Sequence, residues 1–508
     1  MAVTSGRPAP SPAARDRWAQ HLPDAVDPDS LDLLQGGNLT AQWRQTWEGA
    51  PDRRVLFDDS AGWTTAEQLE ARTSRIAGRL SALGLSAGDR LLLSAQPSTD
   101  VVVLYVAALR LGLVVVPMNT GYLEREVAHI VSDAGPAAAV VDDAARGSWV
   151  RAASAGPVHV LDPTVAVPDA PVPELDTAAP DDPALLVYTS GTTGAPKGAV
   201  LSHGNLLSSA HAVRLAWRWT PQDTLVLALP LFHLHGLGVG LHGSFTAGAA
   251  VVLRPHFQAD DVFDAATRHA ASLFFGVPTM YGRLAGSPRV AELGRLRLCV
   301  SGSAPLPPDL FTAIADSGGQ RMLERYGMTE TVMNVSNPYD GERRLGTVGI
   351  PLPGVDIALA DGTDEILVRG PNVFAGYWQR PEATAEAMTA DGWFRSGDVG
   401  SFDDAGYLRI VGRRKELIIS GGYNVYPREV EEALREHPAV VDAAVVGVPH
   451  PEWGEQVTAY VVGDRSAETD VLCFLAQRLA PYKRPRQLRY LEDLPRNALG
   501  KVLKQQLR

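Results

Sequence analysis

The chain has 508 residues, of which 45% are hydrophobic and 20% are charged, and its formal net charge is -12. This length predicts two or more domains, and the composition is typical of a soluble globular protein. The acidic balance argues against general nucleic-acid binding. The two cysteines, Cys299 and Cys473, form no metal-ligand or redox pattern.

The first residues predict a loosely attached arm, which we place at residues 1–27. Residues 1–15 are rich in Ala, Pro and Ser and lack the apolar segment of an export signal. Because the two cysteines lie far apart, a reducing cytoplasm is the simplest expected location.

The longest apolar run covers residues 101–117, where Arg110 and Gly112 interrupt it. The run is short for a membrane span, so we expect no membrane partner. It predicts instead a buried helix, capped near residues 98–100, and then a strand at 113–116.

Up to about residue 330, short apolar runs of β type alternate with helical patterns, which predicts α/β layers with largely parallel sheets. These runs lie at residues 90–95, 137–141, 224–228, 250–253, 273–275 and 296–300. From about 346 to 410, short alternating strands such as 365–369 are separated by Gly and Asp turns. That texture indicates a smaller, more antiparallel β region.

The last part of the chain predicts a small α+β domain. It follows the charged segment 413–416, and it contains a short helix that opens at Pro427. Strand patterns come after the helix at 440–447 and 456–462. About 90 residues are enough for a separate domain, although an exposed loop explains the charged segment equally well.

Residues 188–198 read Tyr-Thr-Ser-Gly-Thr-Thr-Gly-Ala-Pro-Lys-Gly and follow an apolar run that predicts a buried strand. Glycines let the backbone turn tightly and bring its N–H groups close to an anion, while hydroxyls add donors. The segment therefore predicts a phosphate-binding loop, with these candidate ligands: Thr189, Ser190, Gly191, Thr192, Thr193, Gly194 and Lys197. It is not a Walker A loop, because a glycine follows Lys197, and a flexible surface linker is the alternative.

Residues 324–331 read Glu-Arg-Tyr-Gly-Met-Thr-Glu-Thr. Tyr326 offers a flat face for a purine, Thr329 offers a hydroxyl to a phosphate, and Glu330 offers an oxygen ligand suited to Mg²⁺. Taken alone, the segment is equally consistent with the start of a helix, where Thr and Glu act as caps.

Two further motifs carry single charged residues. In residues 393–398, Asp398 follows a tight glycine turn, where a carboxylate is suited to bind two ribose hydroxyls, although Gly-Asp turns are common. Residues 495–502 read Pro-Arg-Asn-Ala-Leu-Gly-Lys-Val and contain Lys501. A lysine so near the C-terminus is usually a solvated surface residue.

Together and in this order, these motifs resemble those of the adenylate-forming superfamily, which includes acyl-CoA synthetases, peptide-synthetase adenylation domains and firefly-type luciferases. The likeness covers residues 45–508, and Ser396 replaces the family's usual threonine without loss of the hydroxyl. The resemblance implies ATP, Mg²⁺ and CoA as cofactors. It implies that loop 188–198 binds the β- and γ-phosphates and that Glu330 binds the metal. The other implied nucleotide ligands are Ser303, Ala304, Pro305, Glu324, Tyr326, Gly327, Met328, Thr329, Asp398 and Arg413.

The resemblance also implies a fold and a catalytic cycle. A large N-terminal domain (28–414) of two doubly wound sheets plus a β-barrel would precede a small mobile α+β domain (415–508) that turns about Lys415. In the first step, Lys501 and Thr329 would act as catalytic residues and stabilise the charge that builds as a carboxylate attacks the α-phosphate, while Glu330 would hold the catalytic metal. In the second step, domain rotation would bring the CoA-binding residues to the site. These residues are Gly421, Gly422, Tyr423 and Lys483.

The identity of the acid rests on a narrower resemblance. Residues 229–237, 275–281 and 328–338 look like segments of malonyl-CoA synthetases, in which Arg283 would pair with the distal carboxylate of malonate or methylmalonate. The same resemblance implies a catalytic role for His233, and it implies that three residues line the acid pocket: His235, Gly302 and Met333. Alternatively, Arg283 is a solvated helix residue and the acid is a bulkier secondary-metabolite acid, or the enzyme loads a separate carrier protein.

Overall fold

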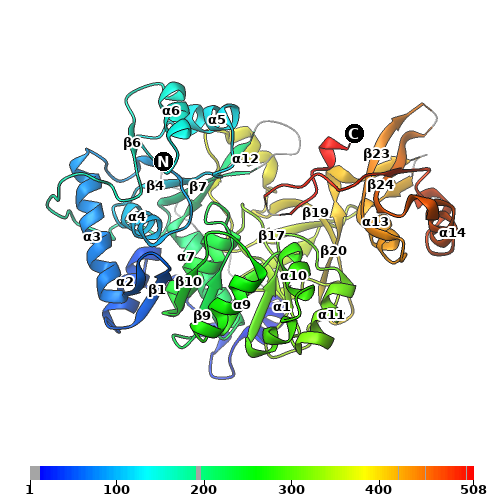
Figure 1. Ribbon diagram of the computed structural model, residues 1–508, viewed down its shortest axis with the longest axis horizontal. Coiled ribbons are helices and arrows are strands. Elements are labelled where there is room, and N and C mark those ends of the chain that lie inside the picture. Colours follow the sequence, from blue (N-terminus) through cyan, green and yellow to red (C-terminus); the bar gives the residue numbers. More distant parts are fainter. Residues whose placement is uncertain (1–11, 190–195, 421–422, 452, 499, 508) are drawn as a thin grey trace. The chain divides into compact units, whose positions relative to one another are not determined.

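The computed structural model describes residues 12–189, 196–420, 423–451, 453–498 and 500–507, which fall into two compact units (Figure 1). The larger unit comprises Met1–Ile357 and Val368–Phe394, and the smaller comprises Ala358–Leu367 and Arg395–Arg508. The chain passes between the units three times: within β16 (Asp356–Leu359), within β17 (Glu365–Arg369) and between Phe394 and Arg395. This division describes which residues pack together and does not describe motion, so the hinge at Lys415 stays a prediction.

One sheet of the larger unit has seven strands in the order β18-β8-β7-β4-β3-β5-β6. The five strands from β7 to β6 are parallel, and β8 and β18 close one edge in antiparallel pairing. Most connections cross over, which gives the doubly wound pattern that the alternation of apolar runs predicts. The strands are β3 (Arg90–Ser94), β4 (Val114–Pro117), β5 (Ala138–Val141), β6 (His159–Leu161), β7 (Pro183–Thr189), β8 (Lys197–Ser202) and β18 (Gly376–Tyr377).

The second sheet of this unit has nine strands in the order β15-β14-β13-β12-β11-β9-β10-β1-β2. Its central strands, from β13 to β1, are parallel. The strands are β1 (Arg54–Asp58), β2 (Gly62–Thr65), β9 (Thr224–Leu227), β10 (Ala250–Leu253), β11 (Leu273–Gly276), β12 (Leu298–Ser301), β13 (Leu323–Tyr326), β14 (Val335–Ser336) and β15 (Ile350–Pro351). The prediction of two α/β layers is therefore confirmed.

Helices cover these sheets, and α4 (Thr99–Arg110) begins at the cap that the sequence predicts. The Ser98 side chain accepts from the Val101 N–H, and eleven of the twelve residues of α4 are buried, all but Asp100. α3 (Ala66–Ala82), which packs against α4, begins with a capping box at Thr65 (Figure 1). The other helices are α1 (Pro12–Trp18), α2 (Leu39–Glu48), α5 (Glu124–Ala134), α6 (Ala144–Ala153), α7 (His203–Ala216), α8 (His242–Ala247), α9 (Ala259–Arg268), α10 (Pro278–Ala285), α11 (Pro308–Gly318) and α12 (Pro381–Ala387).

The described part of the N-terminal arm is attached more firmly than the sequence predicts. Residues 12–18 form α1, and Trp18 is only 2% exposed. His21 is also buried, and its Nε2 lies 3.2 Å from the carbonyl oxygen of Ile350. A composition rich in Ala and Pro does not show this attachment, which comes from the buried side chains of Trp18, His21 and Leu22.

The smaller unit has its own sheet and core. β19 (Phe394–Phe402) and β20 (Leu408–Arg413) pair antiparallel, as predicted for this region. The five-stranded sheet consists of β21 (Ile418–Ser420), β22 (Tyr423–Val425), β23 (Val440–His450), β24 (Gly454–Gly463) and β25 (Gln487–Tyr490). Its core includes apolar residues of α13 (Pro427–Arg435) and α14 (Glu468–Arg478). No helix within the described ranges is long and apolar enough to cross a membrane.

Candidate active site

The predicted phosphate loop is closed at its base by strand pairing. β7 ends and β8 begins at the registered pair Thr189 and Lys197. The Thr189 hydroxyl also donates to the Lys197 carbonyl oxygen at 3.4 Å. On the preceding strand position, the Tyr188 hydroxyl donates to Asp133 at 2.7 Å. The remaining predicted ligands lie outside the described residues: Ser190, Gly191, Thr192, Thr193 and Gly194.

The second motif turns sharply after β13. A Cβ on Gly327 would lie 2.1 Å from the carbonyl oxygen of Val332, so only glycine fits there. Val332 itself has a φ of +53°, which is strained for a β-branched residue and is a feature that clusters at functional sites. The turn buries Glu330, while Thr329 keeps partial exposure.

Two interactions connect Glu330 to distant parts of the larger unit. Its backbone carbonyl oxygen accepts from the N–H of Phe374 at 2.8 Å, and its Oε1 accepts from the Tyr377 hydroxyl at 2.9 Å. The ring of Tyr377 also lies 5.3 Å from the Lys197 ammonium. The structure therefore brings the predicted loop lysine and the predicted metal ligand to one tyrosine, which the motifs do not single out.

The turn after β12 holds three of the predicted nucleotide ligands. Ser303 has a φ of +70°, and Ala304 and Pro305 follow it. The Glu324 carboxylate fixes this turn by accepting from the N–H of Leu306 at 3.0 Å. Tyr326 is buried, and its hydroxyl lies 3.7 Å from the sulfur of Met328. Both motifs thus meet at the carboxyl ends of neighbouring parallel strands, where ligands of such sheets bind.

The second nucleotide motif contains a buried arginine to which the sequence analysis assigned no role. Arg325 is 5% exposed, and its Nε and Nη2 find no hydrogen-bond partner among the described residues. Burial lowers the pKa of Arg325 to about 9, so the guanidinium is still charged at neutral pH. Gly302 allows its approach, because a Cβ there would lie 2.5 Å from the Arg325 Cζ.

His235 completes this buried polar group. Its Nδ1 lies 3.1 Å from the Ser303 hydroxyl, and its Nε2 is buried without a partner in the described ranges. Burial first, and then the nearby charge of Arg325, lowers the pKa of His235 well below its usual range. The imidazole is therefore neutral at physiological pH. His235 opens a π-helical turn (His235–Leu241), a rare geometry that is frequent at functional sites.

The other residues predicted for the acid differ in burial. Met333 is 1% exposed, and His233 is half-buried, with its Nδ1 accepting from the His235 N–H at 3.2 Å. Arg283 lies on the exposed face of α10. Its role in binding a distal carboxylate stays a prediction, whereas Arg325 offers a buried guanidinium in the same unit.

In the smaller unit, strand pairing places Asp398 opposite Arg413. The Arg413 Nε lies 3.1 Å from a carboxylate oxygen of Asp398, and the Asp398 backbone follows Gly397, whose φ is +71°. The predicted ribose carboxylate and its predicted arginine neighbour are thus adjacent.

Lys501 belongs to this cluster. Burial and the positive charge of Arg413 lower its pKa to about 8, while the carboxylates of Glu416 and Asp398 oppose that shift. The positive charge of Lys415 adds to the lowering. Four charged residues predicted from distant motifs therefore lie close enough to influence one another within the smaller unit: Asp398, Arg413, Lys415 and Lys501.

Of the residues predicted to bind CoA, two are described. Tyr423 is 58% exposed and stacks on Tyr482 with ring centroids 4.6 Å apart. Lys483 forms an ion pair with Glu429 at 2.6 Å, so its charge is already balanced within the chain. Gly421 and Gly422 lie outside the described residues.

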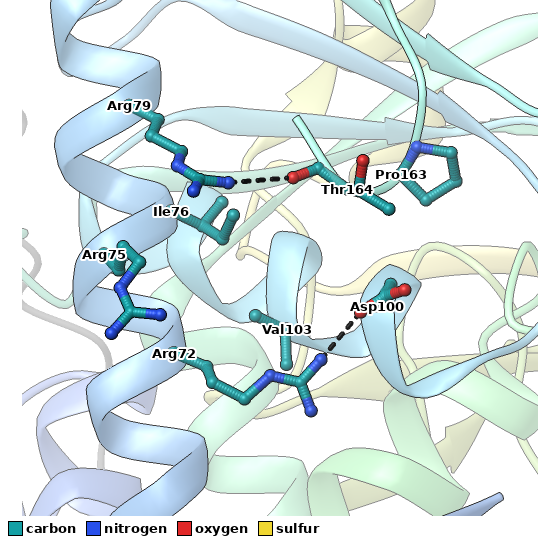
Figure 2. A pocket seen from close by; sticks show the side chains of 8 residues that line it. All are labelled: Arg72, Arg75, Ile76, Arg79, Asp100, Val103, Pro163 and Thr164. Carbon is teal, nitrogen blue, oxygen red and sulfur yellow. Dashed lines mark hydrogen bonds and ion pairs between the residues drawn. The ribbon is translucent and has the colours of Figure 1, made fainter. Parts of the chain in front are cut away.

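A separate hollow of about 210 Å³ lies beside α3, lined by three arginines from one face of that helix (Figure 2). Arg72 pairs with Asp100 at 2.7 Å, and Arg79 pairs with Asp169 at 2.9 Å. Arg79 also donates to the backbone of Thr164 (Figure 2). Because the chain supplies these partners, and none of the lining residues belongs to the predicted motifs, we interpret the hollow as a structural ion-pair cluster.

Sequence profiles agree with this geometry. A profile described as "AMP-binding enzyme" matches residues 43–378, and one described as "AMP-binding enzyme C-terminal domain" matches residues 429–501. The first match alone covers more than half of the chain, which therefore belongs to the AMP-binding enzyme family.

Individual relatives define the enzyme class. The chain is 38% identical to a feruloyl-CoA synthase of an Amycolatopsis species over 87% of this chain and 93% of that one. It is 36% identical to malonate–CoA ligase of Arabidopsis thaliana over 83% of this chain and 78% of that one. The ATP-bound crystal structure of MatB from Rhodopseudomonas palustris superposes with a TM-score of 0.88 at 39% identity, covering 93% and 98% of the two chains. This protein is an ATP-dependent, AMP-forming acyl-CoA ligase that resembles malonyl-CoA synthetases.

Proposed function

We propose that this ligase activates malonate or methylmalonate with Mg²⁺ and ATP and transfers the acyl group to CoA in the cytoplasm. The observation that carries the choice of acid is the buried guanidinium of Arg325, whose Nε and Nη2 find no hydrogen-bond partner in the described ranges. An unpaired buried charge is destabilising, so its presence supports an anionic ligand at that position. A carboxylate matches a guanidinium because it accepts two parallel hydrogen bonds.

A diacid fits this arrangement better than a monocarboxylic acid. One carboxylate must react with ATP, so a second one is needed to neutralise Arg325. Neutral His235, with a buried Nε2 that lacks a partner in the described part of the chain, adds a polar contact without a second charge. The relatives include both a feruloyl-CoA synthase and a malonate–CoA ligase at similar identity, so the choice rests on this buried charge.

The chemistry proceeds in two steps. A carboxylate oxygen of the acid attacks the α-phosphorus, the bond from that phosphorus to the bridging oxygen breaks, and pyrophosphate leaves. Lys501 and Thr329 stabilise the negative charge on the phosphoryl oxygens, and Lys197 with its loop holds the pyrophosphate. The sulfur of CoA then attacks the acyl carbon, AMP leaves with the bonding electrons, and the thiol proton is released. Rotation about Lys415 separates the two steps.

The residues present fit a magnesium ion that arrives with ATP. Among the described residues, no three His, Cys, Asp or Glu side chains gather to hold a metal. Mg²⁺ usually needs only one or two carboxylates in addition to substrate phosphates, and buried Glu330 supplies one. When bound, the ion neutralises charge on the phosphate oxygens.

The test compares Arg325→Met with Arg283→Met, using malonate and its monocarboxylic analogue propionate. If Arg325 binds the distal carboxylate, Arg325→Met lowers kcat/KM for malonate by about 30- to 1,000-fold. Propionate should be spared, and stability should not fall, because an unpaired charge has been removed. The reverse pattern would assign the carboxylate to Arg283.

A diacid is refuted if neither variant separates malonate from propionate. Higher turnover of aryl acids than of malonate would favour the bulkier-acid alternative. Faster transfer to a carrier protein than to CoA would favour the carrier-loading alternative.

A further inference from the structure

Tyr377 connects two residues that the reaction needs in fixed positions. Its hydroxyl donates to Oε1 of Glu330 at 2.9 Å, and its ring lies 5.3 Å from the Lys197 ammonium. Glu330 is proposed to bind the metal, and Lys197 the departing pyrophosphate. One side chain therefore contacts both the proposed metal ligand, Glu330, and the proposed pyrophosphate ligand, Lys197.

The backbone of Tyr377 is also fixed, by strand pairing and by a hydrogen bond. It pairs with Ala199, two residues after Lys197, in the antiparallel pairing of β18 and β8. Its N–H donates to the Thr384 hydroxyl at 2.9 Å. A Cβ on Gly376 would lie 2.7 Å from Thr384, so glycine is required for this close approach. The strand that carries Tyr377, β18, therefore lies beside β8, which begins at Lys197.

The ring has little freedom to rotate. Phe374 contacts it edge-on, with centroids 4.9 Å apart, and the Phe374 N–H donates to the Glu330 carbonyl oxygen. A tyrosine hydroxyl carries its proton at neutral pH, so Tyr377 acts as the donor in its hydrogen bond to Glu330.

We propose that Tyr377 is a positioning residue for the metal–triphosphate complex. Its hydroxyl fixes the rotation of the Glu330 carboxylate, and its ring restrains the Lys197 ammonium through a cation–π contact. Its role is to act through Glu330 and Lys197, the two residues that it contacts. This inference rests on the proposed Mg²⁺-dependent binding of ATP, and it is independent of which acid is used.

Two variants separate the two roles. Tyr377→Phe keeps the ring and removes the hydroxyl, whereas Tyr377→Leu removes both. ATP binding is measured by titration calorimetry without acid or CoA, so that no turnover occurs, in EDTA and over a series of Mg²⁺ concentrations. Tyr377→Phe should raise the Mg²⁺ concentration needed for half-maximal enhancement of ATP binding by about tenfold, with binding in EDTA unchanged. Tyr377→Leu should also weaken binding in EDTA by about threefold.

Tyr105→Phe is the matched control. Tyr105 also lies in the larger unit, and its hydroxyl lies 2.6 Å from the Nε2 of His242 in the core. Its variant should lower the thermal unfolding temperature without moving the Mg²⁺ dependence. The double variant Tyr377→Phe, Glu330→Gln should lose no more Mg²⁺-dependent ATP affinity than Glu330→Gln alone, because the hydroxyl acts through that carboxylate.

The inference is overturned if Tyr377→Phe shows the wild-type Mg²⁺ dependence, or if it weakens binding equally with and without Mg²⁺. If wild-type ATP binding does not respond to Mg²⁺ at all, the proposed metal dependence itself fails, which is a separate result. Should Tyr377→Leu not fold, the isosteric Phe variant still decides the outcome.

Discussion

Replacing Lys501 by methionine should stabilise the protein at neutral pH. Burial lowers the pKa of Lys501 from 10.5 to about 8, which means that the folded state disfavours the charged ammonium. At about 1.4 kcal/mol for each tenfold change in acidity, the difference corresponds to roughly 3 kcal/mol. Lys501 keeps some exposure, so we expect about half of that value in the free energy of unfolding.

The sign of the pH dependence follows from proton binding. Between pH 8 and 10.5 the unfolded state binds more protons at this residue than the folded state does, so wild-type stability rises with pH in that range. The advantage of Lys501→Met should be full below about pH 8 and vanish above about pH 10.5. Denaturant unfolding followed by tryptophan fluorescence over this pH range measures it.

Activity should depend on the same proton. The first step needs the ammonium, so kcat/KM for pyrophosphate exchange should fall above about pH 8. The rate of thioester formation from preformed acyl-adenylate should not show this fall at high pH. Lys501→Ala should abolish the first step and largely retain the second. The reasoning is refuted if Lys501→Met is less stable than the wild type at pH 7, or if both steps lose activity equally.

Two further variants test the larger unit. Gly302→Ala would place a Cβ 2.5 Å from the Arg325 Cζ; the displaced guanidinium should raise KM for malonate about tenfold, a loss of 1.4 kcal/mol, while calorimetry shows unchanged ATP affinity. An unchanged KM would contradict the position of Arg325 in the acid pocket. Trp18→Ala should reduce the free energy of unfolding by about 3–5 kcal/mol, because this side chain is 2% exposed. A loss below 1 kcal/mol would restore the view of a loosely attached arm.

The sequence predicts most of the fold because its signals are local. The strand expected at 250–253 is β10 with the same bounds, and the helix expected after residues 98–100 is α4 with Ser98 as its cap. Apolar runs and capping residues act within a few positions, so they can be recognised without knowledge of the tertiary structure. The described part of the arm shows the opposite case, since the burial of Trp18 depends on distant residues.

The sequence motifs predict which segments form the site, but they do not predict the contacts between those segments. Arg325 lies inside the second motif, but all four residues of β13 are buried, so no alternation in the sequence marks which side chain needs a partner. Tyr377 lies far along the chain from Lys197, and only the pairing of β18 with β8 brings them together. Non-local strand pairing of this kind leaves no short-range pattern, although the Gly376–Tyr377 pair hints at a close backbone approach.

A comparison of buried arginines explains why Arg325 indicates a ligand. Arg110 is 3% exposed and Arg325 is 5% exposed, so both have lost nearly all contact with water. Arg110 lies between Glu70 and Asp176, with both pairs at 3.1 Å, and the fold therefore supplies its countercharges. Arg325 has no such carboxylate in the described part of the chain, and the glycine beside it keeps the approach open.

Lys501 shows a weaker imbalance in the smaller unit, where burial and the charges of Arg413 and Lys415 outweigh the nearby carboxylates of Glu416 and Asp398. Both cations reduce the stability of the free protein, and a fold selected for stability alone would pair or replace them. Each is explained if the missing negative charge arrives with substrate: a carboxylate for Arg325 and a phosphate for Lys501. The chain thus holds two positive charges at a cost in stability, and the binding of an acid and ATP offsets that cost where the reaction takes place.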